Sequence, residues 1–153
     1  MDFNDLETIK SEVNQFFQKT SFELDVENLK VDDQTIFVNM RTGDPKILIG
    51  QNGQTLAEIQ HLLKRVLMRK INQPFYINLD INNYKEKKIE YLKEIVKTFA
   101  NDVALTSQEK ILMPMSAYER RIIHLELANR SDIITESIGE KDERRLVIKP
   151  RIS

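Results

Sequence analysis

The 153-residue sequence contains no cysteine, no tryptophan, two histidines and four glycines. Without cysteine there is no disulfide framework, no thiol nucleophile and no cysteine-based zinc site, and two histidines are too few for a three-histidine metal centre. No apolar run approaches the roughly 20 residues of a membrane-spanning helix, and the acidic start MDFNDLETIK differs from a secretory signal, which is basic and then apolar. We therefore expect a cytoplasmic protein without membrane insertion, cofactor or metal.

The formal net charge of -1 hides a segregation of charge along the chain. Residues 1–44 carry 4 basic and 10 acidic side chains, a net charge of -6, whereas residues 45–153 carry 19 and 14, a net charge of +5. A basic side of this kind can face a polyanion while the acidic side stays in solvent. Charges also segregate by chance, so this pattern alone leaves both interpretations open.

Hydrophobic periodicity and turn signals predict an α+β first half. Asp44-Pro45 is expected to open a short helix that Gly50 ends, and Thr55 with Glu58 has the spacing of a capping box. The predicted elements are a helix over 3–17, strands over 22–26 and 36–40, helices over 45–49 and 55–70, and a strand over 75–81. Their order is helix, strand, strand, helix, helix, strand.

The second half is predicted to be a smaller α/β domain. Ser116 and Glu119 form a second capping-box pattern at the start of a helix. The predicted elements are a long helix over 83–103, a short strand over 111–113, a helix over 116–129, and strands over 133–136 and 146–149. We expect two domains, residues 1–82 and residues 83–153, with a linking helix over 83–105.

The first candidate site is the turn Gly50-Gln51-Asn52-Gly53 between the two helices of the first half. Two glycines at this spacing arise readily by chance and also serve an ordinary turn between helices. Alternatively, their missing side chains let the backbone approach a sugar-phosphate chain, the next helix directs N–H groups at phosphate, and Ile49 offers a base an apolar wall. The nearby cations that we include in this site are Lys46, Lys64 and Arg65.

Because this turn lies between helices that are inserted between strands, the first half resembles a KH domain, and its element order is similar to the bacterial type II variant. The resemblance implies that the turn clamps about four nucleotides of a single strand. Related clamps often carry Lys or Arg between the glycines, where this chain has Gln51 and Asn52. That departure implies weaker binding, or binding through amide hydrogen bonds.

The second candidate site is formed by Arg120, Arg121 and His124, which are three or four residues apart and share one face of the predicted helix. Arginine binds phosphate with a bidentate fork, and histidine donates to phosphate or stacks on a base. A surface histidine with incidental arginines gives the same spacing. The residues of this helix that we expect to face the core are Tyr118, Ile122 and Leu125.

The sequence around this helix, residues 113–124, resembles the R-three-H domain, which is named for an Arg and a His separated by three residues, here Arg120 and His124. Residues 137–139 and 144–148 are similar to the closing hairpin of that family, which implies that Arg144 and Arg145 come near the helix. A KH-like part followed by an R-three-H part is similar to the Jag family, also called SpoIIIJ-associated or KhpB proteins, from about Phe22 to Pro150.

The resemblance to the Jag family implies a bacterial, cytoplasmic RNA-binding protein that acts in post-transcriptional control, in some members with a small KH-domain partner. Many members begin with an additional Jag-N domain, which we expect to be absent because this sequence starts with the helix of the KH part. The main hypothesis is non-enzymatic binding of single-stranded RNA, and by the same chemistry of single-stranded DNA, with both surfaces holding adjacent stretches of one strand.

Two other classes of function are alternatives to RNA binding. A protein-interaction adaptor, associated for example with ribosomes or cell division, would use the acidic N-terminal part to dock a basic partner. An enzyme is disfavoured because the sequence shows no nucleophile, Walker loop or metal cluster. A carboxylate that could pair with His124 is also lacking, since Glu119 is needed in the cap and Glu126 projects elsewhere.

Overall fold

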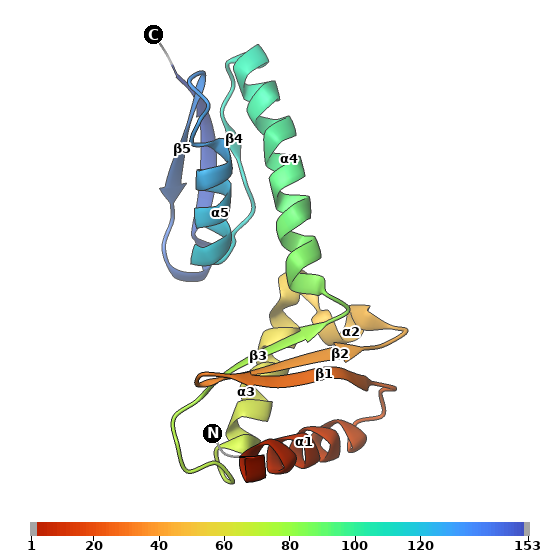
Figure 1. Cartoon of the computed structure of the whole chain (residues 1–153). Helices are drawn as coiled ribbons and strands as arrows, with labels where there is room; N and C mark the ends of the chain where they lie inside the picture. Colours follow the sequence, from red (N-terminus) through yellow and green to blue (C-terminus); the bar gives the residue numbers. More distant parts are fainter. Residues whose placement is uncertain (1–2, 152–153) are drawn as a thin grey trace. The chain divides into compact units, whose positions relative to one another are not determined.

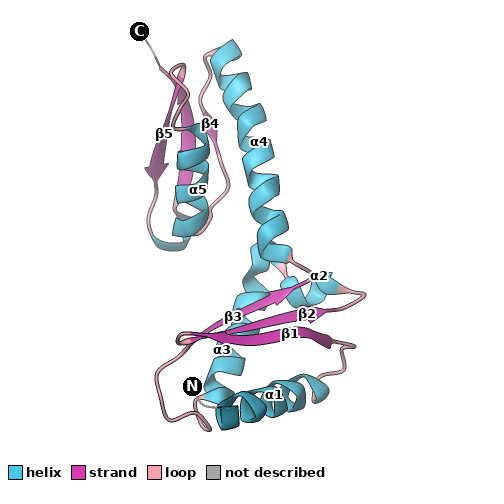
Figure 2. Ribbon diagram, viewed as in Figure 1, coloured by secondary structure: helices cyan, strands magenta, loops and turns pink. Residues whose placement is uncertain are grey.

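Each half of the chain forms a three-stranded β-sheet that helices cover on one face (Figure 1; Figure 2). The chain divides into two units, Met1–Tyr84 and Lys85–Ser153, and the computed structural model describes residues 3–151. Within this described range, no helix is both long and apolar enough to cross a membrane. The α+β class predicted from the sequence is confirmed.

The first unit has the predicted order of elements, and its sheet has the strand order β1-β2-β3. β1 (Asp25–Asp32) pairs antiparallel with β2 (Thr35–Arg41), and β2 pairs parallel with β3 (Tyr76–Ile81). Along β2 and along β3, every second side chain points to the same face of the sheet. On that face, Val38 and Leu79 lie side by side and are fully buried.

Three helices close the core of the first unit: α1 (Phe3–Gln18), α2 (Pro45–Ile49) and α3 (Gln54–Leu67). Each of them contributes apolar side chains to the core, and in α1 and α3 these are spaced as in an amphipathic helix. The buried residues that they supply are Ile9, Val13, Phe17, Leu48, Leu56, Leu63 and Leu67.

The predicted start of the first strand is wrong. β1 begins at Asp25 rather than at Phe22, and its register shifts between Val26 and Asn28. A bulge of this kind changes which side chains face the core. After Val26, the side chains that pack against the core are therefore those of Leu29 and Val31.

The predicted capping box of Thr55 and Glu58 does not form. α3 begins at Gln54 after Gly53, and no side chain caps its first turn. Gly53 has a φ of 85°, so the chain enters α3 from a left-handed turn, whereas a capping side chain requires an extended residue before the helix.

The second unit has the strand order β4-β6-β5, and all its strands pair antiparallel. β4 (Lys110–Ile111) starts one residue earlier and is shorter than predicted, whereas β5 (Ile133–Ile138) and β6 (Arg145–Pro150) contain the two predicted strands. The helices α4 (Tyr84–Thr106) and α5 (Ala117–Leu127) pack on the same face of this sheet. Its core includes Val96, Ala100, Ile123, Leu127, Leu146 and Ile148.

The start of α5 is fixed by the predicted capping box. The Glu119 amide donates to Oγ of Ser116 (3.3 Å), and the Ser116 amide donates to Oε2 of Glu119 (2.8 Å). Nζ of Lys88 on α4 lies 2.6 Å from the other oxygen of Glu119. Burial opposes ionisation of this carboxyl, but the hydrogen bonds from Lys88 and Ser116 outweigh that effect and hold the pKa of Glu119 below its ordinary value of 4.5.

The prediction of which face of α5 is buried is wrong. Tyr118 is 68% exposed and Leu125 is 61% exposed, whereas Ile123 and Leu127 are buried. Glu119, four residues before Ile123, is also buried. The helix therefore packs through residues 119, 123 and 127, and the predicted core residues Tyr118 and Leu125 lie in solvent.

Candidate nucleic-acid interface

The turn between α2 and α3 has positive φ at three of its four residues. The φ angles of Gly50, Asn52 and Gly53 are 70°, 53° and 85°, a region that glycine and asparagine enter at lower cost than most residues. The Gly50 amide donates to the carbonyl of Lys46 (2.9 Å), and the Gly53 amide donates to the carbonyl of Gly50 (3.4 Å). The side chains of Gln51 and Asn52 are exposed, so the turn presents two amide groups to solvent.

The space beside each glycine is filled by the protein itself. A Cβ added at Gly50 would lie 2.1 Å from Oγ1 of Thr55, and a Cβ added at Gly53 would lie 2.8 Å from Cε1 of Tyr84. Internal packing and positive φ therefore account for both glycines. Contact with a ligand at this turn depends on the exposed residues between the glycines.

The apolar side chains of α2 divide between the core and solvent. Ile49, which we predicted to form a wall for a base, is half-buried and packs partly against the core. Ile47 is 60% exposed. Ile47 is therefore the more accessible apolar group next to the turn, and sequence reasoning missed it because it sits in the apolar run Ile47-Leu48-Ile49.

The predicted cations of the first unit are not gathered at the turn. Lys46 is exposed on α2, one turn before Gly50. Lys64 lies 11 residues after Gly53, or roughly 16 Å along α3, and its Nζ lies over the rings of Phe75 (6.0 Å) and Tyr76 (5.7 Å). Arg65 follows Lys64 and is exposed. Of these three cations, Lys46 alone is adjacent to the turn in the chain.

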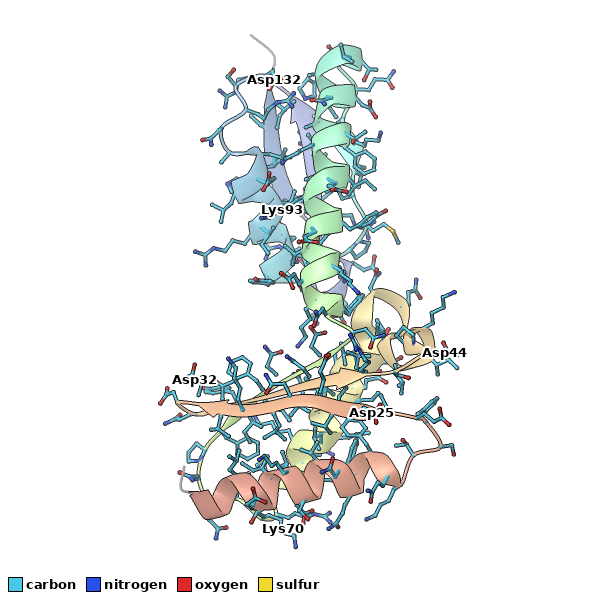
Figure 3. All side chains as sticks on the ribbon, turned by 45° about the vertical axis from the view of Figure 1, so that its right-hand side comes forward. Asp25, Asp32, Asp44, Lys70, Lys93 and Asp132 are labelled. Atoms are coloured by element: carbon cyan, nitrogen blue, oxygen red, sulfur yellow. The ribbon has the colours of Figure 1, made fainter. Side chains whose placement is uncertain are left out.

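Lys70, which follows the end of α3, belongs to a different part of the first unit. Nζ of Lys70 lies 3.5 Å from Oε1 of Glu12 on α1. Figure 3 shows Lys70 beside α1 and Asp44 beside α2, well separated from each other. Lys70 therefore contributes to the contact between α1 and the end of α3.

The predicted residues of α5 do lie together on its accessible side. Arg121 and His124 are exposed and Arg120 is half-buried. Nη1 of Arg120 donates to the carbonyl of Met115 (2.6 Å), which ties the helix to the segment before it. Nδ1 of His124 lies 2.6 Å from Oγ1 of Thr135 on β5. Among residues 3–151, the side chain of Arg121 has no hydrogen bond or ion pair.

The two arginines of the closing hairpin point to opposite faces of the sheet. Nε of Arg144 donates to Oγ of Ser137 (3.0 Å), and Ser137 is two residues after Thr135, so both lie on the face that contacts α5. Arg145 pairs in register with Ile138, on the other face, and its guanidinium binds the carboxylate of Glu143. The prediction that Arg145 comes near α5 is therefore wrong, whereas Arg144 lies on the same face as His124.

The carboxylates of α5 are directed away from the side of the helix that carries Arg121 and His124. Glu119 is bound by Lys88, and Oε1 of Glu126 lies 2.7 Å from Nζ of Lys97 on α4. Figure 3 shows Lys93, the second lysine near Glu126, on the α4 helix. The part of the chain that the structure describes holds no group of three His, Asp or Glu side chains suited to a metal ion. Arg121, His124 and Arg144 thus form a cationic face, hereafter the α5 face.

Comparison with known families identifies both units. A KH domain matches residues 12–112, and an R-three-H domain matches residues 90–150. The chain belongs to the KH domain family. The first unit is accordingly the KH unit and the second is the R-three-H unit. Its helix α5 carries Arg120 and His124, which have the spacing for which the R-three-H domain is named.

Relatives named for RNA binding match most of the chain. It is 33% identical over 150 residues to RNA-binding protein KhpB of Clostridium symbiosum, in a match that covers 93% of this chain and 66% of the relative. It is 27% identical to the protein of the same name in Streptococcus pneumoniae (94% of this chain, 45% of the relative) and 36% identical to that of Bacillus subtilis (67% and 50%). The predicted resemblance to the Jag family is confirmed, and the chain spans about half to two thirds of the length of these relatives.

Proposed function

We propose that this chain binds single-stranded RNA, through the exposed turn of the KH unit and through the α5 face of the R-three-H unit. The observation that carries the proposal is the succession of two nucleic-acid modules, a KH and an R-three-H domain, in a chain related over most of its length to proteins named for RNA binding. Binding of single-stranded DNA through the same phosphate and base chemistry belongs to the proposal.

The turn of the KH unit is proposed to act through hydrogen bonds more than through charge. Gln51 and Asn52 offer amide donors and acceptors, and the first turn of α3 follows directly, without a capping side chain. The Gly53 and Gln54 amides donate to the carbonyls of Gly50 and Gln51, so it is the N–H groups that follow them at the start of α3 that favour an anionic group such as phosphate. Lys46 is the cation next to this turn in the chain.

The α5 face is proposed to supply most of the charge attraction. Arg121 is free to form a bidentate contact with phosphate, and Arg144 keeps further N–H donors beyond its bond to Ser137. The contact with Thr135 holds the ring of His124 by Nδ1, so Nε2 is the atom that faces a ligand. Catalysis is not part of the proposal, because Glu119 and Glu126 are both bound to lysines of α4.

The proposal predicts a strong dependence of RNA binding on salt. If Lys46 neutralises about one phosphate at the turn and the α5 face about two to three, log affinity should fall with log salt at a slope of about -2 to -3, at about -0.7 per phosphate of a single strand. Fluorescence anisotropy with a labelled single-stranded RNA over a range of salt concentrations measures this slope. A flat response would contradict the proposal.

A matched pair of variants locates the contact in the R-three-H unit. Arg144→Gln removes a cation from the α5 face, whereas Arg145→Gln removes the same charge from the opposite face. We expect the first variant to weaken binding and to make the slope about 0.7 less negative, and the second to change both little. Equal effects of the two variants would show that only overall charge matters.

Variants at Gln51 and Asn52 test the turn without disturbing its fold. Gln51→Glu with Asn52→Asp keeps the size of both side chains and the tolerance of residue 52 for positive φ. We expect weaker RNA binding with unchanged thermal unfolding. Unchanged binding would assign no contact to the turn.

We also propose that the protein is cytoplasmic and that it has a small KH-domain partner, as the Jag family implies. The alternative, a protein-interaction adaptor, is favoured by the net charge of -6 over residues 1–44. Pull-down from a lysate with and without ribonuclease separates the two. Partners that survive digestion, together with a flat salt response, would favour the adaptor.

A further inference from the structure

The exposed side of α5 carries a second kind of surface beside its cations. Tyr118, Arg121 and Leu125 are three and four residues apart and therefore lie along one stripe of the helix. Tyr118 is 68% exposed and Leu125 is 61% exposed, one on each side of Arg121 along the chain. An aromatic ring and an aliphatic group thus flank a guanidinium that has no partner among residues 3–151.

We propose that Tyr118 is a stacking platform for a base of single-stranded RNA whose phosphates are held by Arg121 and its neighbours on the α5 face. This inference rests on the proposed RNA binding and extends it to a residue outside the Arg and His that name the R-three-H domain. Stacking on an aromatic ring is largely independent of base identity, so Tyr118 adds affinity with little sequence preference.

The charges around the stripe favour a nucleic acid over a protein as the occupant. Both carboxylates of α5 are bound to lysines on the α4 side of the helix. Arg121 and His124 are exposed. Arg144 lies on the same face of the sheet as Thr135, which His124 contacts. An exposed ring next to such cations combines the two elements of single-strand binding surfaces, a positive track for the backbone and an aromatic platform for bases.

The exposed position of Tyr118 makes this inference testable without unfolding the chain. The side chain lies outside the core of the second unit, so Tyr118→Ala should leave thermal unfolding unchanged. Tyr118→Phe keeps the ring and is the conservative variant. Tyr91→Ala is the matched control, because it removes another exposed tyrosine (60% exposed) from α4, outside the stripe.

The experiment compares two probes with the full chain: a labelled oligouridylate and an abasic strand of equal length, which has the same phosphates but no bases. We expect Tyr118→Ala to lower affinity for oligouridylate by about 5- to 150-fold, the range for one stacked base, and to leave affinity for the abasic strand and the salt slope unchanged. Tyr118→Phe and Tyr91→Ala should behave as the parent chain. Arg121→Gln should instead weaken binding of both strands and reduce the slope.

The outcomes separate this inference from the proposed function. If the parent chain fails to bind oligouridylate, the proposed function itself is wrong. If it binds with the expected salt slope and Tyr118→Ala binds equally well, or loses affinity equally for both strands, base stacking is overturned while RNA binding stands. Unchanged RNA binding with loss of a ribonuclease-resistant protein partner would assign the stripe to a protein and would also overturn the inference.

Discussion

Replacing Gly50 with alanine should destabilise the KH unit strongly, whether or not RNA is present. The new Cβ would lie 2.1 Å from Oγ1 and 2.8 Å from Cβ of Thr55. Overpacking of this kind costs about 1–3 kcal/mol, and alanine at φ 70° and ψ -175° adds strain of about 1–3 kcal/mol. The expected loss of about 2–6 kcal/mol is a large share of the roughly 5–15 kcal/mol by which a folded domain is stable.

Gly43→Ala is the matched control for this substitution. Among the described residues, none other than Gly43 and its two chain neighbours has an atom within 4 Å of the Cβ position at Gly43, and the φ of Gly43 is not positive. The free energy of unfolding should therefore change by less than about 1 kcal/mol. Thermal unfolding followed by circular dichroism compares the two variants. At about 4–8 °C per kcal/mol for a domain of this size, Gly50→Ala should lower the midpoint by at least about 8 °C.

A second-site variant separates the two causes of the loss. Thr55→Ala removes Oγ1, the closest atom, but leaves the Cβ and the backbone conformation of Gly50 in place. The double variant should therefore recover part of the stability that Gly50→Ala loses. A midpoint for Gly50→Ala close to that of Gly43→Ala would refute the reasoning, since it would mean that Thr55 does not fill the space beside Gly50.

Two further predictions concern the ion pair of Glu119 and the turn of the KH unit. Glu119→Gln keeps a cap acceptor but removes the charge that Lys88 binds, so urea unfolding should show a loss of roughly 1–2 kcal/mol. The difference in stability between the parent chain and Glu119→Gln should have its full size above pH 4.5. It should vanish as the pH falls through the lowered pKa of Glu119 in the folded chain, because a carboxyl with a lowered pKa stabilises the fold only when it is ionised. Gln51→Lys should strengthen RNA binding and make the salt slope more negative by about 0.7, whereas Gln34→Lys, which adds the same charge between β1 and β2, should not.

Where glycine and proline set the backbone, the sequence was sufficient to place the elements. Pro45 opens α2, as predicted, because proline fixes a helical φ. Gly50 ends α2, as predicted, because it adopts a positive φ that most residues avoid. The packing of Thr55 and Tyr84 against the glycines could not be predicted. Tyr84 lies 31 residues after Gly53, and only the folded KH unit brings its ring to the turn.

The two capping-box patterns show why local spacing is not decisive. Ser116 with Glu119 forms the box, and Thr55 with Glu58 has the same spacing but does not. The difference lies in the residue that leads into each helix. Ser116 has an extended conformation with ψ of 158°, whereas α3 is entered through Gly53 in the left-handed region.

The buried face of α5 depends on an interaction that local sequence does not contain. Residues 119, 123 and 127 are spaced as one face of a helix. Because this set begins with a glutamate, the more apolar set of Tyr118, Ile122 and Leu125 was predicted to face the core instead. Glu119 is buried at low cost because Lys88, 31 residues earlier in the chain, neutralises it and the Ser116 amide binds it. The ion pair therefore decides which face of the helix is left to solvent, and with it which aromatic side chain is available to a ligand.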